Sequence, residues 1–221
     1  MSRKQLNQSR RTDNKRGVFP PAKHTHYNID NGLNIAGDDT NYIEIKSDGE
    51  INLHGTARVR KELDFNAGSV RAIGLDAATW ISHGIKGAWE FKDNKDAQII
   101  TAINFPKDMD LSEAPIIKVN WSSVEIEEDA VWQLEYLYRQ FGEDTTANAQ
   151  DTLSQIATSS ARADGFVTEE FTGIDIPNIN DRTIFIRLTR MSSDEDDTLG
   201  NTAELHSLIF VYVSDKLGES L

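Results

Sequence analysis

Short segments in which apolar and polar residues alternate cover the chain from about residue 55 to its end, and this pattern constrains the fold most strongly. In one of them Trp132, Leu134 and Tyr136 fall on the same face of a strand, because side chains alternate along a strand with a period of two. Loops rich in Asp, Gly, Ser and Asn separate the segments. The best candidate for a helix, residues 143–157, has a much weaker pattern. We predict strands near residues 55–65, 69–75, 86–92, 97–105, 115–122, 130–139, 152–160, 166–172, 182–190 and 205–214.

Many short strands with few helices predict an all-β fold, a jelly-roll β-sandwich over residues 55–221. Residues 27–54 contain two shorter hairpin patterns, each with turn residues at its centre. These hairpins have too few apolar side chains to be stable alone. We therefore expect residues 27–54 to form a linker or an oligomerisation region that is ordered by a partner surface, either from another chain or from the main domain. Residues 1–26 are polar and basic, and we predict an extended N-terminal arm.

Charge is distributed unevenly along the chain. Residues 1–24 carry seven basic side chains against one acid, which leaves the other 197 residues with a formal charge of −19. A body this acidic repels phosphate, so nucleic-acid binding by the folded part is not expected. We interpret the arm as a tether to other proteins, with a nucleic-acid contact or a solvated tail as alternatives. Its candidate binding residues are Arg3, Lys4, Arg10, Arg11, Lys15 and Arg16.

Residues 105–123 (FPKDMDLSEAPIIKVNWSS), residues 131–136 (VWQLEY) and the ending from Asp196 to Tyr212 resemble the β-sandwich (jelly-roll) domains of tailed-phage virion proteins. Residues 43–59 are similar to short β segments that often precede such domains. The resemblance implies a non-enzymatic virion structural protein, a homotrimer of the head-decoration, head-fibre, tail-fibre or spike type. It would be made in the host cytoplasm and attached through its arm to capsid or tail proteins.

Two alternatives to this interpretation remain open. A basic arm before an acidic jelly roll is also typical of single-jelly-roll coat proteins. The chain could instead be a host-glycan-binding receptor-recognition module of a tail fibre, because aromatic faces stack on the apolar faces of sugar rings. For that role Trp80 is the candidate exposed contact, since small residues precede it in an expected loop, whereas we expect Trp89, Trp121 and Trp132 to fill the core.

Enzymatic signatures are absent from the sequence. The chain has no Cys, no nucleophile elbow, no His-Glu-x-x-His and no phosphate-binding Gly-rich loop, so we predict no catalytic residues and no cofactor. No membrane contact is expected either. The longest strongly apolar run, residues 208–213, is far shorter than the roughly 20 residues of a membrane helix.

Two residue groups are candidate metal sites. His24 and His26 lie two residues apart, so an extended strand would place both rings on one side, where imidazoles suit Zn, Ni, Cu or Fe. Asp194, Asp196 and Asp197 collect hard oxygen ligands of the kind that calcium prefers. Solvated loops are the alternative interpretation of both groups.

Overall fold

The structure is a computed structural model, and it contains two units. The smaller comprises residues 1–57 and 217–221, and the larger residues 58–216. No helix within the described parts is long and apolar enough to cross a membrane. The basic residues predicted as a tether, from Arg3 to Arg16, lie outside the described residues. The described residues are 25–28, 32–36, 42–46, 49–55, 58–140, 142–143, 149–177 and 182–217.

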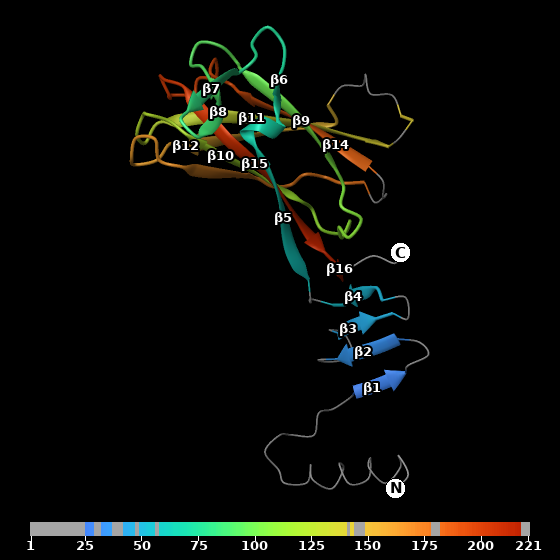
Figure 1. Ribbon diagram of the computed structural model, residues 1–221. Coiled ribbons are helices and arrows are strands. Elements are labelled where there is room, and N and C mark those ends of the chain that lie inside the picture. Colours follow the sequence, from blue (N-terminus) through green and yellow to red (C-terminus); the bar gives the residue numbers. More distant parts are fainter. Residues whose placement is uncertain are drawn as a thin grey trace, which may run out of the picture. The chain divides into compact units, whose positions relative to one another are not determined.

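The larger unit is a sandwich of two antiparallel sheets (Figure 1). One sheet has the strand order β13-β10-β15-β8-β7, with β5 also paired to β15, and the other has the order β12-β11-β14-β9-β6. The strands are β5 (Val59–Asn66), β6 (Arg71–Ala72), β7 (Thr79–His83), β8 (Lys86–Phe91), β9 (Gln98–Asn104), β10 (Ile116–Ser122), β11 (Asp129–Gln140), β12 (Asp151–Thr158), β13 (Val167–Phe171), β14 (Arg182–Arg190) and β15 (Ala203–Ser214).

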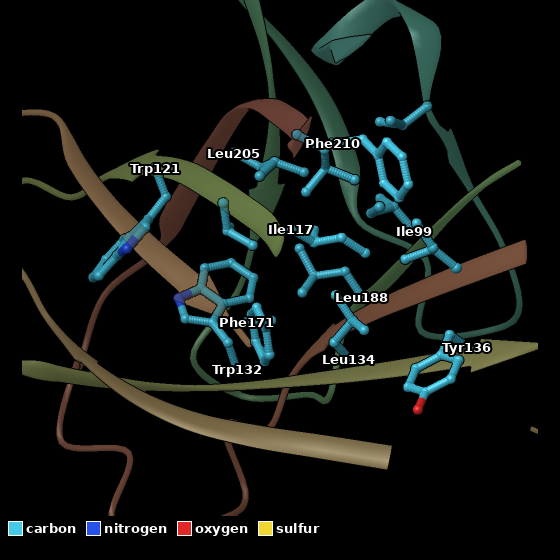
Figure 2. Packing of buried hydrophobic residues seen from close by; sticks show 14 of the residues in the cluster. Ile99, Ile117, Trp121, Trp132, Leu134, Tyr136, Phe171, Leu188, Leu205 and Phe210 are labelled. Carbon is cyan, nitrogen blue, oxygen red and sulfur yellow. The ribbon is translucent and has the colours of Figure 1, made fainter. Parts of the chain in front are cut away.

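An aromatic and aliphatic core fills the space between the two sheets (Figure 2). Trp121 of β10 and Trp132 of β11 are fully buried, and their ring centroids lie 5.8 Å apart in an edge-to-face contact. Phe91 packs against Trp132 in the same manner at 5.1 Å. Edge-to-face pairs contribute beyond the apolar area that they bury. The prediction that Trp121 and Trp132 belong to the core is confirmed, and Trp89 packs partly buried against it.

The structure confirms the predicted all-β jelly-roll β-sandwich, and most strands lie where alternation placed them. The helical candidate over 143–157 is wrong, because β12 begins at Asp151 and pairs with β11 along its whole length. The strand expected at 69–75 is shortened to β6, which follows a single 3-10 turn over Ala67–Ser69. Strand β7 was not predicted, because its apolar residues Trp80 and Ile81 are adjacent and do not alternate with polar ones.

The smaller unit contains four antiparallel strands in the order β1-β2-β3-β4. They are β1 (Thr25–Asn28), β2 (Gly32–Ala36), β3 (Tyr42–Ile45) and β4 (Ile51–Leu53), and the two residues of β16 (Lys216–Leu217) are divided between the two units. The register sets Ile43 opposite Leu53 and Ile45 opposite Ile51, so these side chains share one face. Glu44 lies on the other face and accepts a hydrogen bond from Asn52 Nδ2 at 3.2 Å.

Arg190, at the end of β14, ties the two large sheets and a loop together. Its Nε and Nη2 donate to the Asp197 carboxylate at 3.0 and 2.7 Å, and both side chains are almost fully buried. Nη1 donates to the carbonyls of Phe91 and Asn201, and Nη2 donates also to that of Leu199. All five guanidinium N–H groups therefore have acceptors, which a buried charge requires.

Replacing Asp197 with Ala should strongly destabilise the sandwich, because it leaves the Arg190 charge buried without its counter-ion. We expect a loss of about 3–5 kcal/mol in the free energy of unfolding, measured by urea denaturation. Asp194→Ala is the matched control: this exposed residue of the same loop only accepts a hydrogen bond from Asp196 N, and its loss should cost less than about 1 kcal/mol. Equal effects of the two variants would contradict the structural role of the pair.

Candidate functional site

A groove of about 750 Å³ lies on the outer face of the sheet β12-β11-β14-β9-β6. Residues from β6, β9, β11 and β14 form its floor, and residues of three connecting segments form its rim. The lining residues are Ser69, Arg71, Ile73, Ile100, Thr101, Ala102, Glu135, Tyr136, Leu137, Ala149, Phe185, Ile186 and Arg187.

Strand register arranges the floor of the groove in two adjacent rows. In the first row Ile100 of β9 lies opposite both Arg71 of β6 and Arg187 of β14, and Arg187 lies opposite Glu135 of β11. In the second row Phe185 lies between Ala102 and Leu137. Residues that oppose each other in an antiparallel pair share one face of the sheet. The groove therefore presents a row of charged groups beside a row of apolar ones.

Phe185 is the exposed aromatic side chain in the groove. It retains 39% of its accessible surface, although it lies at the centre of a sheet rather than at an edge. Its neighbour on β9 is Ala102, whose small side chain leaves one side of the ring open. Fully burying a Phe side chain is worth about 1.5–3 kcal/mol, so covering the 39% of Phe185 that remains exposed would contribute about 0.6–1.2 kcal/mol. The ring therefore favours a ligand with an apolar surface.

Arg187 and Glu135 form a two-pronged ion pair beside Phe185. Arg187 Nε donates to Glu135 Oε2 at 2.5 Å, and Nη2 donates to Oε1. The hydrogen bond with Glu135 raises the pKa of Arg187 above its usual value, so the guanidinium stays charged. This pairing holds the two side chains in place and uses two of the five N–H donors of Arg187. An aromatic face beside fixed donors and acceptors is a recognition site for an amphipathic polar molecule.

Trp80, the exposed contact predicted from the sequence, lies away from this groove on the other sheet. The structure places it in β7 rather than in a loop, with 46% of its surface exposed. Its ring contacts Trp89 edge-to-face at 5.1 Å. A Cβ atom at Gly87 would lie 2.1 Å from Trp80 Cζ2, so the ring rests directly on that glycine. Its role in binding stays a prediction.

Neither predicted metal site gains support. Across the described ranges, no three His, Asp or Glu side chains gather as a metal ion would require. Asp197 is buried and bound by Arg190, so its oxygens are already engaged, and Asp194 accepts a hydrogen bond from Asp196 N at 3.1 Å. His24 lies outside the described residues, as does the side chain of His26.

Comparison with known proteins finds weak similarity to solved structures. No protein family and no curated protein matches the chain. Among solved structures, the C-terminal CBM6 of LamC, a marine laminarinase from Zobellia galactanivorans, has 12% identity and a TM-score of 0.42 over 69% of this chain and 99% of its own. Xyl-CBM35, in complex with a glucuronic acid-containing disaccharide, has 9% identity and a TM-score of 0.45 over 71% and 99%.

A third solved structure, the xylan-binding module CBM15, has 17% identity and a TM-score of 0.40 over 70% of this chain and 97% of its own. At TM-scores below 0.5 these likenesses carry no conclusion about the ligand or the fold. The β-sandwich part of the resemblance drawn from the sequence is confirmed by the two packed sheets of the larger unit. Its virion part stays a prediction.

Sequence reasoning missed every polar and aromatic residue of the groove. Arg71, Glu135 and Arg187 lie on three strands far apart in the chain, and alternation only assigns each of them to a solvent-facing position. One local signal was available at Phe185. It occupies the face opposite Ile184 and Ile186, where a strand with one buried face normally carries polar residues.

The Arg187–Glu135 pair should contribute little to folding, because exposed ion pairs are screened by water. Of the two side chains, that of Arg187 is 43% exposed. We expect Arg187→Ala, Glu135→Ala and the double variant each to change the free energy of unfolding by less than about 1 kcal/mol in urea denaturation. A loss above roughly 2 kcal/mol for either single variant would assign the pair to the fold rather than to a site.

Proposed function

We propose that this chain is a non-enzymatic carbohydrate-binding protein that holds a glycan in the groove of the sheet β12-β11-β14-β9-β6. The observation that carries the proposal is the position of Phe185, half-exposed at the centre of a sheet beside the Arg187–Glu135 pair. Sugar rings have one apolar face and a rim of hydroxyl groups. The apolar row of the groove matches the apolar face of the sugar, and the charged row matches its hydroxyl groups.

Each row has a defined role in this proposal. The open face of Phe185 stacks on the C–H face of a sugar ring, with Leu137 and Ala102 extending the apolar contact. Hydroxyl groups of the same ring meet the Arg187 donors and the Glu135 oxygens, which are fixed before the ligand arrives.

Replacing Phe185 with Ala should weaken glycan binding while leaving the fold intact, because the ring is the main apolar contact and is not part of the core. We expect the full-length chain to bind a subset of oligosaccharides on a glycan array, and Phe185→Ala to lose roughly tenfold or more of that affinity in titration calorimetry. Trp80→Ala is the control on the other sheet. Binding lost with Trp80→Ala and kept with Phe185→Ala would refute the groove as the site.

A second candidate function, compatible with the first, is the trimeric virion structural role implied by the resemblance. The observation that favours it is the apolar row of the small sheet, formed by Ile43, Ile45, Ile51 and Leu53. The register continues that row at the positions of Leu33 and Ile35. Ile43, Ile45 and Ile51 keep part of their surface exposed, whereas Leu53 is already buried. A sheet with one apolar face requires a partner surface, and three copies that meet on this face would supply it.

Replacing Ile45 with Glu should prevent this self-association, because it places a charge in the shared apolar face. We expect the unmodified chain to have three times its 24.8 kDa mass in light scattering, and Ile45→Glu to have the mass of one chain. Glu44→Gln changes the opposite face and should stay trimeric. An unmodified chain that is monomeric at the concentrations found on particles would contradict the trimer.

A further inference from the structure

The groove carries the opposite charge to the rest of the chain. Its ionisable lining residues are two arginines, Arg71 and Arg187, against one acid, Glu135. The chain as a whole has a formal charge of −13. The outer face of the other sheet carries more acidic than basic side chains, as does the chain as a whole. Its charged residues include Arg60, Lys118, Glu62, Asp64 and Glu170, and Glu90 and Glu204 lie opposite each other.

Arg71 is the arginine of this groove that has no ion-pair partner among the described residues. Glu135 neutralises Arg187 through two hydrogen bonds, so the positive charge of the floor resides at Arg71. Arg71 is exposed, and among the described residues no hydrogen bond or ion pair engages its guanidinium. It lies two strand spacings from Arg187, across Ile100, which is roughly 10 Å of backbone separation. A ligand that stacks on Phe185 and contacts Arg187 is therefore within reach of Arg71.

We propose that the groove selects an acidic glycan, one that carries a carboxylate or a sulfate, and that Arg71 binds this anionic group. This inference rests on the proposed carbohydrate-binding function and adds the class of sugar to it. A guanidinium presents a planar fork of donors that matches the two oxygens of a carboxylate or sulfate. Hydrogen bonds of this kind are about twice as strong as those between neutral groups.

The acidic body of the protein does not prevent such binding. At physiological ionic strength charges are screened over about 8 Å, so the distant carboxylates contribute little at the groove. The charge that a bound anion meets at the Arg71 end of the row is therefore the positive charge of Arg71 itself. Because the ligand contact is partly exposed, added salt should weaken it.

The test uses the full-length chain and an array that pairs uronate-, sialate- and sulfate-bearing oligosaccharides with their carboxyl-reduced or desulfated counterparts. We expect roughly tenfold tighter binding to the acidic member of a pair, and a smaller difference at 0.5 M NaCl than at 0.05 M. The carboxylate and sulfate arms show which anion is preferred. Arg71→Gln should remove the difference within a pair, because the acidic member loses its contact with the guanidinium while both members keep the stacking on Phe185.

Arg60→Gln is the matched control, since Arg60 is an exposed arginine on the outer face of the other sheet. It should leave the preference for acidic sugars intact. Equal binding of both members of each pair, or a preference that survives Arg71→Gln, would overturn this inference and leave the carbohydrate-binding function standing. Failure to bind any oligosaccharide would overturn the proposed function, and the inference with it.

Discussion

Burial of alternate side chains along the long strands is the constraint on which the sandwich and its groove both depend. Trp132, Leu134 and Tyr136 of β11 face the core, so Glu135 and Leu137 must face outward. The same holds on β14, where buried Ile184 and Ile186 force Phe185 outward. A register slip of one residue would move the core-facing side chains of these strands to the solvent face. The tight packing of the core prevents such a slip, and it therefore also fixes the positions of the groove residues.

Two arginines on the same strand, Arg187 and Arg190, show how local surroundings decide what a charge does. Arg190 is fully buried, and every one of its donors is satisfied by Asp197 or a carbonyl group, so it holds the sheets together. Arg187 is partly exposed and has one partner, Glu135, which leaves donors available. Removing the first should unfold the sandwich, whereas changing the second should alter binding alone. The two arginines are only three residues apart in the sequence, so their different roles follow from the different burial of their side chains.

The fold could be predicted from the sequence because its signal is local. Alternation over 182–190 and 205–214 needs only adjacent residues, and Trp121 and Trp132 belong to strands whose apolar face is evident. The groove could not be predicted, because Arg71, Glu135 and Arg187 meet through the order β11-β14-β9-β6, which depends on long-range pairing. Asp197 shows the same limit: among its acidic neighbours it suggested a calcium ligand, and only the packing of Arg190 beside it gives it a structural role.

The proposed glycan site and the proposed trimer support each other, because a trimer would compensate for weak binding at a single groove. A shallow groove that buries one face of a sugar leaves much of the ligand in water, so one site binds weakly. Three copies joined through the row of Ile43, Ile45, Ile51 and Leu53 would hold three such grooves on one particle. The second and third contacts with a repeating glycan then occur at high effective concentration, which raises the overall affinity without any new contact. A separate self-associating sheet is thus the feature that would make a weak carbohydrate site sufficient for attachment.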